Sequence, residues 1–344
     1  MTQKEEKNKP AAPYASELRQ DIVTGDWVVI ATGRAKRPQE FAEVKRVLAD
    51  DAPDPFENPE ESGQEKDVLI YRREDGEWSL RVFPNKYPAF SRGRVARELS
   101  EGPYFAMTGV GYHEIVVTRD SKRSLALLDV WQGAEVFDAY QERYLALMNK
   151  KSVNYIQVFH NHGKEAGASI AHPHSQLMAV PVVSPYIALE LRGAEEYWRS
   201  HKHRVYTVMT EYERQAKKRV VFENEHFIAF CPYASRVAFE TWIVGKRESP
   251  YFERITDEEK FALAEIMQRA LHAIYRGLND PPYNFYIHTA PCDGKDYPHY
   301  QWHIEILPVP PTPWAGFELS TGIEISTIQP EVAAEFLREQ LVNS

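Results

Sequence analysis

The sequence predicts a mixed α/β (α+β) protein made of two similar halves, each an antiparallel sheet crossed by a helix. Two observations predict it. Strand and helix patterns recur in the same order at a spacing of about 130 residues. Within each copy, short alternating apolar runs flank one long segment with helical periodicity. Hydrophobic residues make up 43% of the 344-residue chain, an ordinary share for a protein with a sizeable core.

Each copy contains, in order, a strand, a helix, a second strand, a loop and a third strand. In the first copy the strands are expected at residues 113–118, 154–160 and 174–180. In the second copy they are expected at residues 241–244, 284–288 and 303–307. Both helices have a possible capping box at their start, formed by Asp129 with Gln132 and by Thr256 with Glu259. We therefore expect an N-terminal half over residues 14–190 and a C-terminal half over residues 191–344.

Other segments complete the organisation. Residues 67–71 and 78–83 are typical of a hairpin, residues 186–219 of a helical connection between the halves, and residues 331–341 of a short amphipathic helix. The acidic, proline-punctuated residues 47–66 favour a long surface loop, and residues 1–13 a disordered tail.

Composition excludes several classes of protein. A net charge of −9 argues against general nucleic-acid binding, which needs a basic face. No apolar run reaches the ~18 residues of a membrane span, and the N-terminus lacks the apolar segment of a secretion signal, so we expect a cytoplasmic protein. The two cysteines, Cys231 and Cys292, form neither a disulfide framework nor by themselves a structural zinc site.

The run from His172 to Val180 places several candidate catalytic side chains on one predicted strand. On an extended strand, residues 172, 174 and 176 share a face, so two histidines and a glutamine point the same way while Leu177 and Ala179 point into a core. The preceding loop, residues 161–169, has the glycines and the Ser/Asn pair of a loop that brings backbone N–H groups to an anion. Taken alone, the two histidines could equally be satisfied core residues.

The HPHSQ run at residues 172–176, preceded by N-x5-G-x-S, resembles the histidine-triad superfamily and, within it, the galactose-1-phosphate uridylyltransferase branch. The likeness spans nearly the whole chain. It includes residues 34–38, Asn85 before Tyr87-Pro88, residues 284–291, the H-x-E pair at 303–305 and residues 316–318. The resemblance implies two histidine-triad-like halves related by a pseudo-twofold axis, and a homodimer.

The resemblance also implies covalent chemistry at His174. A neutral imidazole whose other nitrogen is held by an acceptor is a good nucleophile toward phosphorus. It would take a nucleoside monophosphate from a nucleotide sugar and pass it to a sugar 1-phosphate. Gln176 would donate to the phosphoryl oxygens without offering a proton. The other substrate-binding residues that the resemblance implies are Arg34, Arg37, Asn85, Asn161, Gly167, Ser169 and Glu318.

Two metal patterns of the family differ in this chain. A Cys-x-x-Cys zinc site is predicted to be absent, because residues 54–59 contain no cysteine and His172 alone cannot hold zinc. The second pattern, for one structural divalent metal such as zinc or iron, is met by Glu190, His288 and His303, with Glu305 where the family has a final histidine. The alternative is a solvated Glu190 and a Glu305 paired with an arginine.

The leading expectation is UDP-glucose:galactose-1-phosphate uridylyltransferase activity. An adenylyl-transferring phosphorylase acting on ADP-glucose or a dinucleoside polyphosphate is the alternative, because Ser175 and Lys86 depart from the pattern common in uridylyl-transferring relatives. A non-catalytic nucleotide-binding module is a third possibility, which the intact His174 and Gln176 disfavour.

Overall fold

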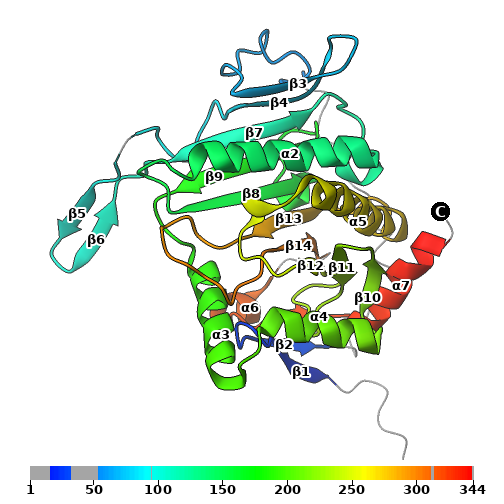
Figure 1. The fold of residues 1–344 in the computed structure, drawn as a ribbon. Coiled ribbons are helices and arrows are strands. Elements are labelled where there is room, and N and C mark those ends of the chain that lie inside the picture. The colour runs from blue at the N-terminus through cyan, green and yellow to red at the C-terminus, as the bar shows by residue number, and fades with distance from the viewer. Residues whose placement is uncertain (1–15, 32–52, 94, 311–313, 343–344) are drawn as a thin grey trace, which may run out of the picture.

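A ten-stranded antiparallel sheet runs through the molecule in this computed structural model (Figure 1), which describes residues 16–31, 53–93, 95–310 and 314–342. The strand order is β10-β11-β12-β14-β13-β8-β9-β7-β4-β3. The strands of the first half are β3 (Leu69–Arg72), β4 (Trp78–Pro84), β7 (Tyr112–Thr118), β8 (Tyr155–His162) and β9 (His174–Val180). Those of the second half are β10 (Val220–Glu223), β11 (Phe227–Phe230), β12 (Thr241–Gly245), β13 (Tyr283–His288) and β14 (His303–Pro308).

The predicted repeat is confirmed by the strand order. Counted outward from the centre, one half reads β8-β9-β7-β4-β3 and the other β13-β14-β12-β11-β10, which is the same path along the chain. The halves join where β8 pairs with β13, with Asn161 opposite Asn284. The two predicted sheets are thus edge-to-edge parts of one continuous sheet, because each would otherwise leave an unpaired central edge.

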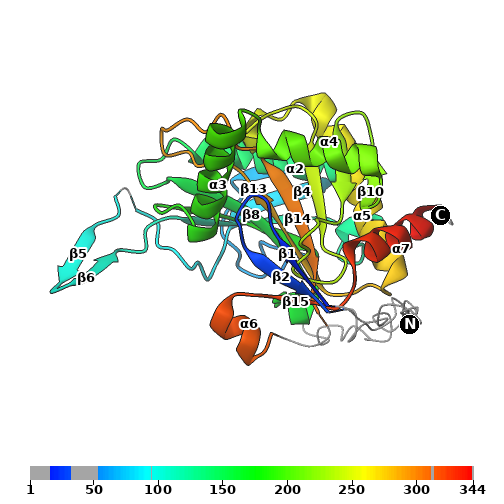
Figure 2. The same ribbon diagram turned by 90° about the horizontal axis from the view of Figure 1, so that it is seen from below.

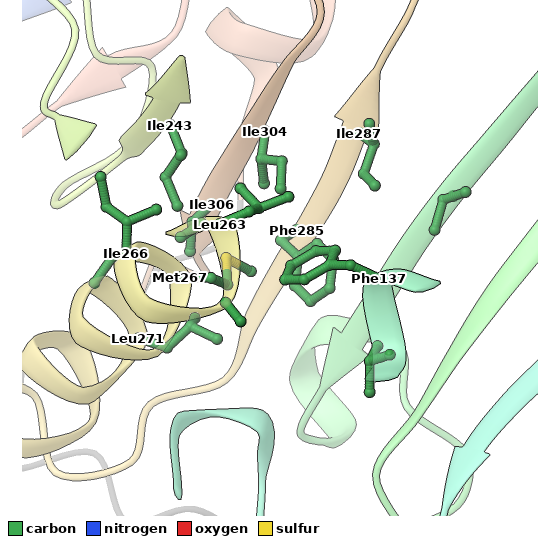
Figure 3. Packing of buried hydrophobic residues seen from close by; sticks show 14 of the residues in the cluster. Phe137, Ile243, Leu263, Ile266, Met267, Leu271, Phe285, Ile287, Ile304 and Ile306 are labelled. Carbon is green, nitrogen blue, oxygen red and sulfur yellow. The ribbon is translucent and has the colours of Figure 1, made fainter. Parts of the chain in front are cut away.

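Two long helices cover one face of this sheet. The helices α2 (Val130–Leu147) and α5 (Asp257–Gly277) lie side by side, and both predicted capping boxes are formed. The apolar stripe of α5 packs on β12, β13 and β14, where Leu263, Ile266 and Leu271 are fully buried (Figure 3). Burial of each large side chain in such a stripe contributes about 1.5–3 kcal/mol.

The other elements surround the opposite face and the edges. The predicted helical connection is two helices, α3 (Pro185–His201) and α4 (Val205–Ala216), because Lys202 adopts a left-handed conformation that ends α3. The helix α7 (Pro330–Val342) packs on α5, as its amphipathic pattern predicts. A small sheet of β1 (Glu17–Gln20), β2 (Trp27–Ile30) and β15 (Ile325–Ser326) and the short helix α6 (Gly316–Thr321) lie at the periphery (Figure 2).

A hairpin of β5 (Glu98–Glu101) and β6 (Tyr104–Met107) projects from the body of the molecule (Figure 1). Its strands pair only with each other among the described residues, and Leu99, Tyr104 and Phe105 are exposed. Among the helices that the structure describes, none has the length and apolar character that crossing a membrane requires.

The acidic loop is more firmly attached than its composition suggests. In its described part, Phe56 is buried against Phe83 and Val117, and Arg81 binds Glu60 and Asp67. One apolar residue therefore anchors a segment that we expected only at the surface. The predicted tail at residues 1–13 and the loop residues 47–52 lie outside the described residues.

Candidate active site

On strand β9, as predicted, the candidate catalytic residues lie on one face and the core residues on the other. Leu177 and Ala179 are fully buried in the core beneath α2 and α5. His174 and Gln176 lie on the opposite face, where the His174 ring packs edge-on against Phe56 with 5.2 Å between ring centroids. Alternation also turns Ser175 away from this face, and its hydroxyl contacts Tyr140 of α2. Ser175 therefore does not face the side on which a nucleotide would bind next to His174.

The backbone fixes the His174 imidazole in the form that a nucleophile needs. Its Nδ1 lies 2.9 Å from the carbonyl oxygen of His172, and because that oxygen only accepts, Nδ1 carries the hydrogen. The lone pair is then on Nε2. Burial lowers the pKa of His174, and the His172 carbonyl and Asp54 only partly offset this effect. The ring is therefore neutral at neutral pH.

This geometry sets a pH dependence for the nucleophile. We expect the single-turnover rate of covalent attack to be flat near pH 7 and to fall on acidification, with a midpoint below the ordinary histidine value of 6.5. The sign follows because acid adds a proton to Nε2, and burial makes that addition harder. A rapid-quench pH profile measures it, and a midpoint above 6.5 would contradict the assignment.

The loop before β9 brings together two predicted phosphate-binding residues. Gly167 adopts φ of 90°, a conformation that favours glycine, and a side chain there would lie 3.6 Å from the Asn161 amide nitrogen. The Asn161 oxygen accepts from Asn284 at 2.8 Å, and Asn284 also donates to the Ala166 carbonyl at 2.8 Å. Asn161 is thereby oriented with its NH2 group toward the loop.

Asn284 orients a predicted phosphate-binding residue, and the sequence did not single it out. It comes from the other half, 123 positions from Asn161, so only the pairing of β8 with β13 places it here. Its signal in the sequence is its position at the start of a predicted strand of the repeat. Ser169 lies exposed in the same loop, two residues after Gly167.

The remaining predicted substrate residues are not gathered around His174. Asn85 follows β4 and lies beside His113, with its amide nitrogen 3.2 Å from Nε2 of that ring. Glu318 accepts from the Ala315 backbone at 3.2 Å and so caps its own short helix α6, which lies at the periphery (Figure 2). Within one chain, α6 therefore has no role at the nucleophile that the described contacts support. Arg34 and Arg37 lie outside the described residues.

Polar protein groups occupy the place of the Cys-x-x-Cys zinc site that is predicted to be absent. His172 Nδ1 lies 2.7 Å from Asp54, and its Nε2 lies 2.6 Å from the Thr118 carbonyl oxygen. Glu57 pairs with Arg119 at 2.9 Å. The ligand atoms of Asp54, Glu57 and His172 lie within 4.8 Å of one another, but no thiolate is among them and each residue already has a protein partner. The absence of a zinc ion here stays a prediction.

A second cluster lies on the same face of the sheet, in the C-terminal half. Atoms of Glu190, His288, His303 and Glu305 that could bind a metal lie within 4.8 Å of one another, and all four residues are buried. Glu190 comes from α3 and is held by the Tyr300 hydroxyl at 2.5 Å. The alternative of a solvated Glu190 is thus wrong, because this residue is only 1% exposed.

Glu305 has an arginine partner as well as its neighbours in the cluster. The half-buried Arg236 binds both Glu305 and Glu240, the latter at 3.0 Å. Burial raises the pKa of Glu305, but Arg236 and the two histidines outweigh it and hold that pKa well below its usual range. Burial lowers the pKa of His303, but Glu305 and Glu190 raise it by more.

His303 is the structural counterpart of His174. Each is the first residue of its strand, and each has Nδ1 at 2.9–3.0 Å from the carbonyl oxygen two residues earlier. However, the Nε2 of His303 lies 3.3 Å from Glu305, and the ring is fully buried. In both halves a backbone carbonyl accepts from Nδ1. Of the two histidines, only His174 then has its Nε2 without a carboxylate neighbour.

A tautomer-fixed histidine, an amide on the same strand face and a glycine loop, all on a duplicated histidine-triad-like fold, are features that suit nucleotidyl transfer. Comparisons with known proteins agree. Residues 3–184 match the family model described as galactose-1-phosphate uridyl transferase, N-terminal domain, and residues 136–344 match a domain of unknown function.

The chain is 34% identical over 333 residues to the ADP-glucose phosphorylase of Arabidopsis thaliana, covering 94% of this chain and 92% of that protein. It is 29% identical over 333 residues to the galactose-1-phosphate uridylyltransferase of Thermotoga maritima, covering 94% and 98%. A crystal structure of an Arabidopsis thaliana ADP-glucose phosphorylase with bound ADP-glucose superposes with a TM-score of 0.80 at 32% identity, covering 94% and 99%. The chain belongs to the galactose-1-phosphate uridylyltransferase family and is an enzyme of the nucleotidyltransferase class.

Proposed function

We propose that this enzyme moves a nucleoside monophosphate from a nucleoside diphosphate glucose to a second phosphate through a covalent intermediate on His174. The observation that carries the proposal is the His174 ring, whose Nδ1 is bound to a backbone carbonyl and whose Nε2 is left as the nucleophile. The nearby donors Gln176 and Asn161 support it, because charge on the phosphoryl oxygens must be stabilised by preorganised groups.

The steps balance without a general acid. Nε2 of His174 attacks the α-phosphorus, the bond from that phosphorus to the sugar phosphate oxygen breaks, and sugar 1-phosphate leaves with the electron pair. A phosphate is a stable leaving group that needs no added proton. An oxygen of the incoming phosphate then attacks the phosphorus and releases His174. An amide at position 176 suits this exchange, because it donates hydrogen bonds but no proton.

We propose ADP-glucose as the donor and inorganic phosphate as the acceptor. The 34% identity to an ADP-glucose phosphorylase and the TM-score of 0.80 to a structure with bound ADP-glucose support the donor. Lys86 after Asn85 adds support, since the uridylyl-transferring pattern favours an acidic residue there. UDP-glucose with galactose 1-phosphate is the second candidate, which the family model and the Thermotoga maritima relative favour.

A covalent-adduct experiment tests both. The purified chain is incubated with ADP-glucose or UDP-glucose, and intact mass spectrometry with peptide mapping locates any nucleotidyl group. We expect AMP on His174, and its discharge as ADP when inorganic phosphate is added. A UMP adduct discharged by galactose 1-phosphate would establish the second candidate. Folded enzyme that forms neither adduct, and exchanges no labelled glucose 1-phosphate into either nucleotide, would contradict the mechanism.

We also propose that Glu190, His288, His303 and Glu305 hold one structural divalent metal. Two imidazoles and two carboxylates are a donor set that suits zinc, iron or manganese. Two buried carboxylates, of Glu240 and Glu305, share the guanidinium of Arg236, and the buried Glu190 adds a third negative charge beside the histidines, so a further cation would balance the cluster. The metal would brace α3 against β13 and β14.

Elemental analysis is expected to find about one such metal per chain, and much less in Glu190→Gln, because that change removes a buried carboxylate ligand. Metal-free protein with an unchanged melting temperature would contradict the metal site.

We propose that the enzyme is a homodimer in the cytoplasm. The exposed apolar residues of the β5–β6 hairpin, Trp314 just before α6 and Phe317 within α6 support an interface. The free cysteines fit a reducing compartment. Trp314 also lines a hollow of about 500 Å³ that extends from Asn161 to His288. Light scattering of the purified protein tests the oligomeric state, and a monomer at micromolar concentration would contradict it.

A further inference from the structure

His113 of β7 contacts the side chain of Gln176, which in the proposed mechanism faces the phosphoryl group. Its Nε2 lies 2.8 Å from the side-chain oxygen of Gln176, and the residue is buried. β7 is the neighbour of β9 in the sheet, with Ile115 opposite Gln176 and His113 opposite Met178. His113 is thus placed diagonally from Gln176 on the same face, within reach of a long side chain.

The contacts of His113 decide which of its nitrogens carries the hydrogen. The backbone N–H of Ala89 points at Nδ1 from 3.3 Å, and because an N–H only donates, Nδ1 must accept. The hydrogen of the neutral ring is then on Nε2, which donates to the Gln176 oxygen. Burial lowers the pKa of His113, in agreement with a neutral ring.

The segment that carries Ala89 is itself held against β7. The backbone N–H of Asn85 donates to the His113 carbonyl at 2.8 Å, and the Asn85 side-chain oxygen accepts from the Tyr87 backbone at 2.9 Å. The Asn85 amide nitrogen lies beside the His113 ring, 3.2 Å from Nε2. This segment therefore holds the ring in place, and within it the Ala89 N–H, not the Asn85 amide, fixes the tautomer.

This arrangement removes an ambiguity in the Gln176 side chain. A primary amide has one end that accepts and one that donates, and rotation of half a turn exchanges them. Toward an anionic phosphoryl group, the NH2 end stabilises charge and the oxygen end repels it. With its oxygen held by His113, Gln176 can present only the NH2 end.

We propose that His113 is a positioning residue that orients the Gln176 amide so that its NH2 group faces the phosphoryl oxygens. The proposal rests on the proposed function, since it concerns the same nucleotidyl transfer. His113 does not touch the reacting atoms and acts through Gln176 alone. Its loss leaves an amide that points either way in the ground state and must be ordered in the transition state.

The test compares two replacements of His113 in two backgrounds. His113→Gln keeps an N–H close to the place of Nε2, whereas His113→Leu has similar bulk and no donor. We expect His113→Leu to lower kcat about 10–100-fold, with the KM for nucleotide sugar within about threefold of wild type, because an orienting partner is lost while binding groups remain. His113→Gln is expected to recover most of that rate.

The same His113→Leu change is then made in the Gln176→Ala enzyme. We expect it to have no further effect there, because the group it orients is gone. A wild-type rate in His113→Leu, or an equal loss with and without Gln176, would overturn the proposal and indicate a packing role only.

Folding and function are separated by two additional comparisons. Should His113→Leu not fold, His113→Asn replaces it, because the shorter amide cannot reach Gln176; it is expected to be slow where His113→Gln is fast, and equal rates would overturn the proposal. If wild-type enzyme forms no nucleotidyl-histidine, the proposed function fails. If the adduct forms normally and His113 variants equal wild type, only this inference fails.

Discussion

Replacing His174 by alanine is expected to lower nucleotidyl transfer by about 10⁴-fold or more, because it removes the nitrogen that we propose forms the covalent intermediate. The nitrogen that would attack is the one left free by the His172 carbonyl, and its structural counterpart in the second half, His303, has its own Nε2 at Glu305. Steady-state turnover with the donor that labels the wild-type enzyme measures the loss, and intact mass spectrometry should show no adduct.

The matched control is His201→Ala, at the exposed end of α3, which should keep wild-type turnover. The alanine at position 174 leaves a gap beside Phe56, so a modest fall in melting temperature is expected alongside the catalytic loss. Retention of more than about a tenth of the wild-type rate by folded His174→Ala protein would show that another residue is the nucleophile.

Replacing Arg236 by methionine is expected to destabilise the enzyme by about 3–5 kcal/mol, since it leaves buried carboxylates without their cation. Arg236 binds Glu240 and Glu305, and both carboxylates are at most 1% exposed. For a chain of this size the melting temperature should fall by roughly 4–7 °C. Thermal or urea denaturation measures the change.

Two further variants test whether the loss of stability comes from the unpaired buried charge. Arg199→Met breaks an exposed pair with Glu195 on α3 and should change stability by less than about 0.5 kcal/mol. Adding Glu305→Leu to Arg236→Met should recover part of the lost stability, because an apolar pair replaces an unpaired charge. If Arg236→Met has the same melting temperature as the wild type, the prediction is wrong, and the cluster does not depend on this guanidinium for its charge balance.

Local patterns were enough to predict the main elements of both copies. Alternation over two residues placed Leu177 and Ala179 in the core and His174 on the other face, and both helix starts were found from four side chains that satisfy N-terminal N–H groups. The break at Lys202 was missed because no glycine or proline marks it. The packing of Phe56 against the sheet was not predicted, because the residues around it in the sequence are acidic or proline.

The sequence by itself determined the duplicated order of elements and the strand that carries His174 and Gln176, because these depend on periodicity and on residue types at short spacing. The four residues of the second cluster came from the family resemblance, because they lie on segments far apart in the chain. The tertiary structure alone decided that the halves share one sheet, that Asn284 orients Asn161, and that Arg236 meets Glu305. The same holds for His113 and Gln176, 63 positions apart. Such contacts arise from strand register and packing between distant segments, which no local pattern encodes.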